Sequence, residues 1–113
     1  MSEFGPLLQS LTRHRGVLAC LVASEEDGIV VDGTAHVGVG TNAFAALTAA
    51  LCRKAQRASD TAGFGQVTFF ELEAEGGRVL ASGRNGLLLI VVGERELQVG
   101  LVRVELRRAV EAL

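Results

Sequence analysis

A glycine-rich stretch in the first half of the chain is the clearest candidate for chemistry. Gly38, Gly40 and Ala43 have the spacing Gly-x-Gly-x-x-Ala ahead of a predicted helix, an arrangement in which backbone N–H groups can bind a pyrophosphate. That fingerprint needs a parallel strand–helix–strand unit, whereas the strand predicted before it is the return arm of an antiparallel hairpin. We therefore interpret residues 38–43 as a loop and a helix start, with an enzyme or small-ligand sensor that uses this loop as the alternative.

The histidines, acidic residues and serines form no recognisable catalytic or metal-binding pattern. His14 and His36 have no second ligand at metal spacing, which favours solvated side chains. The acidic residues 25–27 lack the roughly six to eight oxygen ligands of a calcium loop, so they indicate a charged hairpin tip. No serine stands in a Gly-x-Ser-x-Gly motif, and no phosphate-binding loop ending in Gly-Lys-Ser/Thr is present. We expect no catalytic residue, no cofactor and no metal site.

Length and charge limit the function further. The chain has 113 residues, of which 49% are hydrophobic and 21% charged, so we expect one globular domain over residues 1–113. The formal net charge is -2, and the basic residues are scattered, which argues against nucleic-acid or anionic-membrane binding. Trp and Tyr are absent, which argues against base-stacking platforms.

The cysteines indicate the compartment. Cys20 and Cys52 each lie in an apolar segment and form no Cys-x-x-Cys pair, as expected of reduced thiols in a cytoplasmic protein. The longest apolar run, residues 87–92, is far shorter than the roughly 20 residues that a membrane span needs.

Hydrophobic periodicity and turn residues predict eight elements in the order α-β-β-α-β-β-β-α. Hairpin turns are expected at Asp27-Gly28, Gly76-Gly77 and Asn85-Gly86. The runs 17–23 and 87–92 are apolar on both faces, so we place them side by side in the centre of the sheet. The fold class is therefore α+β, a five-stranded antiparallel sheet with helices on both faces. The expected helices cover residues 6–14, 41–60 and 101–113, and the expected strands cover residues 17–23, 29–31, 66–74, 78–82 and 87–92.

The long helix has two sides that are both rather apolar. We expect one side to cover the sheet with Phe44, Leu47, Leu51, Ala55 and Ala58. The other side is too apolar for a solvated face, and its small residues permit close approach of a second helix. A helix-on-helix interface with a second copy is one interpretation; alanines that only support helicity are the other. The residues of this outer side are Ala45, Ala46, Thr48, Ala49, Cys52, Arg53, Gln56 and Arg57.

The start of the third expected strand would make a poor unprotected edge. Val67, Thr68, Phe69 and Phe70 favour β structure and place apolar side chains on both faces. Pairing with the same strand of a second copy would cover them. Burial by this chain's own helices is the alternative.

Taken in order, these pieces resemble the roadblock/LC7 family of dynein-light-chain-like domains, which includes bacterial gliding-motility regulators. A leucine-containing helix leads through Gly16-Val17 into an apolar strand, residues 26–30 form an Asp-Gly hairpin, and an alanine-rich long helix follows. Residues 100–103, Gly-Leu-Val-Arg, then enter the last helix. The resemblance covers nearly the whole chain and implies a profilin-like fold.

The resemblance also implies a homodimer whose long helices lie side by side and whose strands 66–74 join two sheets. It implies a non-enzymatic platform that binds a bacterial Ras-like small GTPase and, in some bacterial members, promotes hydrolysis by the partner's own residues. A scaffold subunit of a sensor-kinase or motor complex is the alternative. We assign the dimer interface to Ala45, Ala46, Ala49, Cys52, Val67, Thr68, Phe69 and Phe70, and partner binding to Thr48, Arg53, Gln56 and Arg57.

Overall fold

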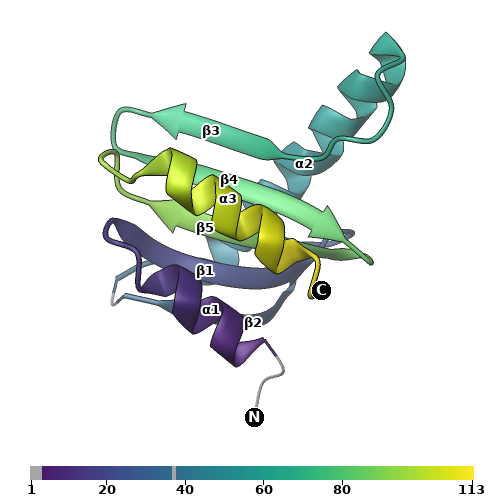
Figure 1. Ribbon diagram of the computed structural model, residues 1–113. Helices are drawn as coiled ribbons and strands as arrows, with labels where there is room; N and C mark the ends of the chain where they lie inside the picture. The colour runs from purple at the N-terminus through teal and green to yellow at the C-terminus, as the bar shows by residue number, and fades with distance from the viewer. Residues whose placement is uncertain (1–3, 37) are drawn as a thin grey trace.

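The computed structural model describes residues 4–36 and 38–113. In this part of the chain the elements follow in the predicted order, and the strands form one antiparallel sheet, which confirms the α+β class (Figure 1). The helices are α1 (Gly5–Thr12), α2 (Thr41–Ala62) and α3 (Val99–Val110). The strands are β1 (Val17–Ser24), β2 (Val30–Ala35), β3 (Phe70–Ala74), β4 (Gly77–Arg84) and β5 (Leu87–Gly93).

The two strands predicted to lie in the centre do lie there. The strand order is β2-β1-β5-β4-β3, and each neighbouring pair is antiparallel. Residues 19–23 of β1 and 88–92 of β5 are buried, because helices cover both faces of the sheet centre. β2 and β3 are left as the two edges of the sheet.

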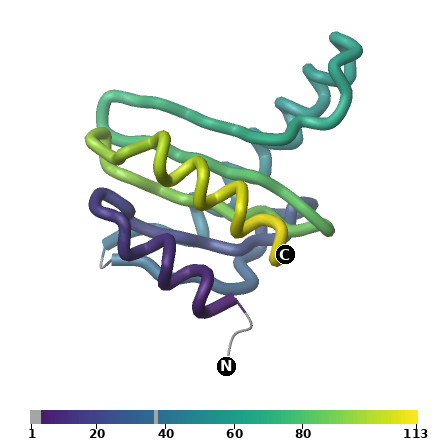
Figure 2. Tube along the Cα trace, viewed as in Figure 1, coloured from purple at the N-terminus to yellow at the C-terminus, as the bar shows by residue number. Residues whose placement is uncertain are grey.

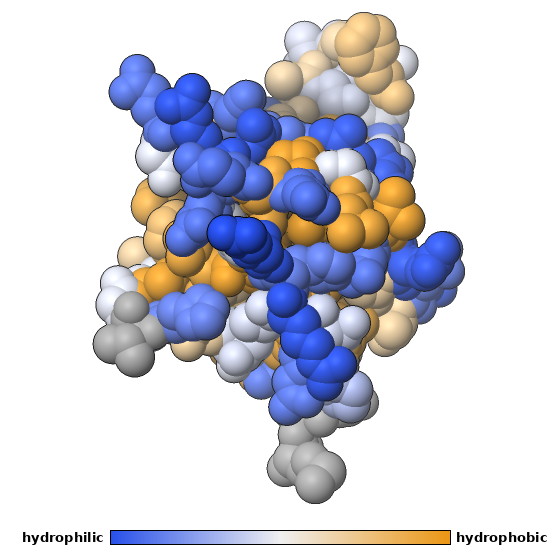
Figure 3. Space-filling model, turned by 60° about the vertical axis from the view of Figure 1, so that its left-hand side comes forward, coloured by the Kyte–Doolittle hydropathy of each residue, from blue (hydrophilic) through white to orange (hydrophobic). Residues whose placement is uncertain are grey.

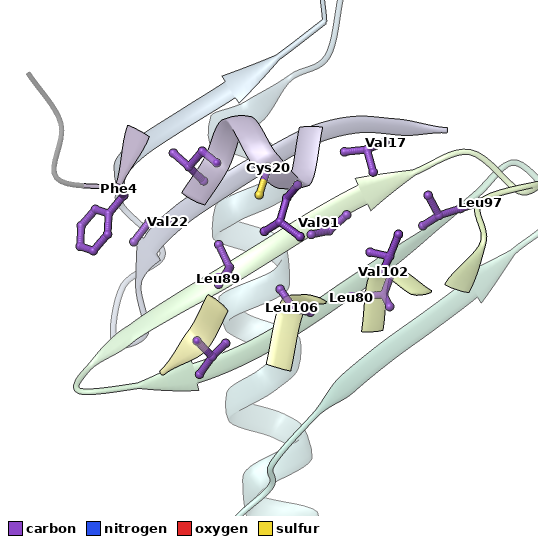
Figure 4. Close-up of a cluster of buried hydrophobic side chains, with 13 residues drawn as sticks. Phe4, Val17, Cys20, Val22, Leu80, Leu89, Val91, Leu97, Val102 and Leu106 are labelled. Carbon is purple, nitrogen blue, oxygen red and sulfur yellow. The ribbon is translucent and has the colours of Figure 1, made fainter. Parts of the chain in front are cut away.

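The helices form two unequal layers. α1 and α3 lie side by side on one face of the sheet, and α2 crosses the other face (Figures 1 and 2). Under α1 and α3 the core is made of large side chains: Leu8, Leu11 and Leu106 pack with Leu89 and Val91 of β5. Figure 4 shows this cluster between the sheet and the two helices. Burial of this apolar surface makes the main favourable contribution to the free energy of packing α1 and α3 on the sheet.

The core under α2 is built differently, from small helix residues against large strand residues. Ala45 and Ala49 are fully buried against a cluster that includes Leu21 and Ile90. Gly28, in the turn after β1, also lies under the helix: a Cβ there would stand 2.7 Å from the Cα of Ala46, and its φ is +74°. Only glycine fits such a contact without strain, so the β1–β2 turn and α2 can approach closely.

Two strands, β2 and β3, differ from the prediction by more than two residues at one end. β2 does not end at Asp32-Gly33 but continues to Ala35. Gly33 is accommodated because the side chain of Leu21 on β1 fills the space beside it, where Leu21 Cδ2 lies 2.7 Å from the position of a Cβ. A glycine inside this strand therefore makes room for a neighbouring side chain and does not terminate it.

β3 is shorter than predicted, because residues 66–69 lie outside it. Their backbone groups are bound by side chains of other elements. The Val67 N–H donates to Oε1 of Gln56 at 2.9 Å, and the Ser82 hydroxyl donates to the Thr68 carbonyl at 2.9 Å. Side-chain hydrogen bonds of this kind offer the backbone an alternative to the ladder of a sheet.

Candidate interaction surfaces

The predicted orientation of α2 is wrong for Leu47, Leu51 and Ala58, which are exposed, although Phe44 packs against the inner cluster as predicted. Ala45, Thr48 and Ala49 are buried against the sheet, whereas Leu47 and Leu51 are 66% and 40% exposed. Cys52 and Phe70 also pack against this inner cluster. Of the alanines assigned to an outer interface, Ala46 alone is exposed. Ala45, Ala49 and Cys52 therefore cannot meet a second helix in this structure, because they already contact the chain's own sheet.

The exposed side of α2 instead carries the large apolar residues. Leu47, Leu51, Ala58 and Ala62 recur at intervals of four or seven residues and are all exposed, so they share one side of the helix. We call this set the α2 outer stripe. Exposed leucines in a row on one helix are typical of a surface that another helix or protein covers.

The far end of α2 extends beyond the sheet. Figures 1 and 2 show its last turns projecting past β3, and in Figure 3 this end stands apart from the rest of the molecule at the top of the view. Phe64, directly after the helix, is an exposed large hydrophobic residue. Gln56 and Ser59 bind the Gly65 carbonyl and so hold the segment after the helix against α2, while the Phe64 side chain stays exposed.

Two of the polar residues assigned to partner binding instead hold neighbouring loops. Nη1 of Arg53 donates to the carbonyl oxygens of Glu25 and Glu26 at 3.1 and 2.7 Å and so ties α2 to the β1–β2 turn. Gln56 accepts the Val67 N–H and donates to the Gly65 carbonyl at 3.1 Å. These side chains position the surroundings of α2.

Of the remaining two, one is buried and one is exposed. Thr48 has 3% of its surface exposed and is not accessible to a partner, so that assignment is wrong. Arg57 is exposed, as is Lys54 one turn earlier. Lys54 and Arg57 are therefore accessible to a partner. Arg53 is exposed as well, although its guanidinium is bound to the β1–β2 turn.

β3 is an edge strand, as an intermolecular sheet would require. It pairs with β4 in continuous register from Phe70↔Ala81 to Ala74↔Gly77, with no shift. Its other side has no neighbouring strand within the described residues. Val67 and Thr68 were assigned to this pairing edge and lie outside β3, so the part of the edge available for pairing is shorter than predicted.

Phe69 is covered by the chain's own helix. The guanidinium carbons of Arg103 and Arg107 of α3 lie 5.4 and 4.8 Å from the centre of its ring, within the range of cation–π contacts. Arg103 also pairs with Glu71 on β3. For Phe69, burial by the chain's own helices is therefore the interpretation that holds.

A groove separates the projecting half of α2 from the sheet. Its volume is about 690 Å³. Phe70, Ala81 and Leu88 contribute apolar residues to it, and Arg53 and Gln56 contribute polar ones. The groove adjoins both α2 and β3, so the structure brings the two predicted surfaces to one side of the molecule.

The residues singled out for chemistry do not converge on a site. His14 is not simply solvated: its Nε2 lies 2.6 Å from Oε2 of Glu105, which joins the end of α1 to α3. His36 is exposed and lies at the far end of β2. Among the described residues, no group of three or more His, Cys, Asp and Glu could hold a metal ion, and no helix is long and apolar enough to cross a membrane.

Both thiols are shielded from water. Burial raises the pKa of Cys20 to about 12. Burial, with a smaller contribution from the charge of Glu25, raises the pKa of Cys52 to about 11. Thiols with such pKa values are poor nucleophiles at neutral pH. In the turn after β1, hydrogen bonds from the Ile29 N–H and from Ser24 lower the pKa of Asp27.

The family comparison gives one clear result. The Roadblock/LC7 domain model matches residues 3–93, which is most of the chain and includes α2, all five strands and α1. No curated protein matches the sequence.

Solved structures show the same fold at low sequence identity. A Roadblock/LC7 domain from Streptomyces avermitilis is 21% identical, with a TM-score of 0.87 over 98% of this chain and 94% of that chain. The gliding protein MglB from Thermus thermophilus is 19% identical, with a TM-score of 0.85 over 96% and 84%. Profilin II from Acanthamoeba castellanii is more distant, 17% identical with a TM-score of 0.57 over 86% and 84%, which agrees with the expected profilin-like architecture.

Proposed function

Because the chain belongs to the Roadblock/LC7 domain family, we propose that it acts as a non-enzymatic homodimeric platform that binds a Ras-like small GTPase. The observation that carries the proposal is the α2 outer stripe, in which Leu47 and Leu51 are exposed while alanines face the sheet. The likeness to the gliding protein MglB supports it.

In the proposed dimer the α2 outer stripes of two copies pack against each other. Burying two leucines per copy contributes favourably by roughly 25 cal/mol for each Å² of apolar surface removed from water. The β3 edges then lie close enough to extend one sheet into the next, which would satisfy their free backbone groups.

The GTPase would bind beside the α2 outer stripe, on the part of the helix that the dimer leaves open. Ala46 and Arg57 are exposed there, and each copy of the dimer contributes one such surface. Hydrolysis would use the partner's own catalytic groups, so any effect on its rate comes from how the platform positions them.

A binding titration tests the proposal. The purified protein is titrated against small Ras-like GTPases loaded with GDP or with a non-hydrolysable GTP analogue, and GTP hydrolysis is followed in parallel. We expect binding that depends on the nucleotide state, and we expect Arg57→Glu to weaken it at least tenfold. Arg95→Glu is the matched control, because Arg95 is exposed in the loop between β5 and α3, outside α2.

The outcomes separate the two roles. Neither binding nor a change in hydrolysis rate, with a panel of such GTPases, would contradict the GTPase assignment. An Arg95→Glu effect as large as that of Arg57→Glu would contradict the assignment of the binding side. Capture of kinase or motor subunits with no GTPase would favour the scaffold alternative.

A further inference from the structure

The β2 edge of the sheet is apolar and open to solvent. Ile29, just before the strand, and Val31 are 64% and 55% exposed, and Gly33 and Ala35 are exposed as well. β2 has a strand neighbour on one side only, β1. Apart from Asp32, β2 consists of β-branched and small residues. An edge strand of such residues is a template for another strand, so we examine what prevents pairing at this edge.

The hydrogen bonds to β1 show which backbone groups of β2 point outward. In an antiparallel pair, alternate residues turn their N–H groups toward the neighbouring strand. The His36 N–H donates to the Leu18 carbonyl of β1 at 3.0 Å. Thr34 and Asp32 therefore also face β1, and Gly33 between them turns its N–H away from the sheet.

That outward N–H is already occupied. The Gly33 N–H donates to Oδ1 of Asp32, the preceding residue, at 2.8 Å. A second irregularity lies beside it: the register with β1 passes from Val22↔Asp32 to Ala23↔Val30, so Val31 is left as a bulge. Bulges and inward charges are both means of making an edge unfit for pairing.

The arrangement at Asp32 costs stability, which argues that it serves another purpose. Oδ2 of Asp32 is buried and has no hydrogen-bond partner among the described residues. A buried polar atom without a partner is unfavourable, and Asp is a poor residue for a strand interior. The opposite edge differs: β3 pairs with β4 in register without a bulge, and its acidic residues Glu71 and Glu73 form ion pairs with Arg78.

From these observations we propose that Asp32 closes the β2 edge to a second copy of this chain by holding the outward Gly33 N–H. The β2 strand is a latent self-pairing edge: without the Asp32 carboxylate, two copies would join through β2 and β2. The sheet then has one edge that can pair with a second copy, β3. An assembly formed through β3 cannot grow further through β2. The mass of each variant is compared with that of the wild type, whether the wild type is a monomer or a dimer.

The test is solution mass by light scattering over a concentration series for Asp32→Val. Valine favours a strand and removes both the acceptor and the buried unpaired oxygen, so we expect a folded protein whose mass rises at least twofold above wild type with concentration. Thr34→Val is the matched control: it adds an apolar side chain on the same strand, but the Thr34 N–H faces β1. Asp32→Asn keeps an oxygen acceptor, and both variants are expected to keep the wild-type mass.

A second change separates edge pairing from unfolding. Adding Val31→Lys to Asp32→Val places a charge on the edge and should restore the wild-type mass. A folded Asp32→Val protein that keeps the wild-type mass at every concentration overturns the proposal, as does an equal rise for Thr34→Val. If Asp32→Val does not fold, hydrogen exchange of the wild type decides: the Gly33 amide should exchange more slowly than the Ala35 amide, and equal rates contradict the proposal.

Discussion

α2 and α3 cover opposite faces of one sheet, and they do so with opposite distributions of large side chains. α3 buries Val102, Leu106 and Val110 against the sheet. α2 buries Ala45, Thr48 and Ala49 and leaves its leucines outside. α3 also exposes Leu101 and Val104. The two helices therefore differ in what they bury: α3 buries a leucine and two valines, whereas α2 buries no residue larger than threonine and exposes both of its leucines.

The difference assigns the two faces different tasks. A helix with large residues inside is held by burial of apolar area, which suits a stabilising layer. A helix with alanines inside can lie close to the sheet and keep its larger residues for another surface. In this molecule Gly28 adds to that closeness, since its turn contacts Ala46 directly. We call the α1/α3 face the supporting face and, in line with the proposed function, the α2 face the interaction face.

The largest effect is expected from truncating a leucine on the supporting face. Leu106 is fully buried, so Leu106→Ala should lower the free energy of unfolding by about 2–5 kcal/mol. Leu47→Ala removes the same atoms from an exposed site and should change the stability of the single chain by no more than about 0.5 kcal/mol. Urea unfolding at a low protein concentration measures both. Equal losses would contradict the contrast between the two helices.

A smaller effect is expected from enlarging a residue under α2. Ala49 is fully buried against the sheet, so Ala49→Leu should overpack the contact and cost about 1–3 kcal/mol. The control is Ala43→Leu near the start of the same helix, where the residue is exposed and the expected change is close to zero. Thermal unfolding of both variants makes the comparison, and a neutral Ala49→Leu would show that α2 does not lie close to the sheet.

The thiols should show the smallest effect on stability, which is confined to alkaline pH. Folding raises the pKa of Cys52, so the folded protein favours the protonated thiol. The contribution of this thiol to the free energy of unfolding is complete below the ordinary thiol pKa of 9.0 and is lost as the pH rises through about 11. At neutral pH the shift should slow alkylation of Cys52 about a hundredfold relative to unfolded chain. Cys20, on the supporting face, has a pKa of about 12 and should react more slowly still. Alkylation of Cys20 at the same rate as Cys52 would contradict the deeper burial of Cys20 on the supporting face.

Much of the fold could be predicted from the sequence, because the deciding signals are local. The central strands are apolar at nearly every position, and Asp27-Gly28 and Asn85-Gly86 mark hairpin turns. The continuation of β2 through Gly33 could not be predicted, because it depends on the position of the Leu21 side chain on the neighbouring strand. The shortened β3 likewise depends on Gln56, which binds Val67 from α2.

The orientation of α2 could not be predicted from the sequence, for a different reason. Periodicity shows that Leu47 and Leu51 share a side of the helix, but it does not show what that side contacts. For a chain considered alone, the larger residues are expected to face the sheet. That rule fails where both sides of a helix contact other surfaces. The pattern that could have predicted the orientation is an alanine-rich side of the helix opposite a row of leucines.

The most direct test of the interaction face is the solution mass of the wild type and of the double variant Leu47→Glu/Leu51→Glu, measured by light scattering over a concentration series. We expect a wild-type mass of twice the 11.9 kDa of one chain and a folded monomer for the double variant, because a charge at each exposed leucine position prevents the α2 outer stripes from packing. A wild type that stays at the mass of one chain at all concentrations would contradict it, as would a double variant that still forms the dimer.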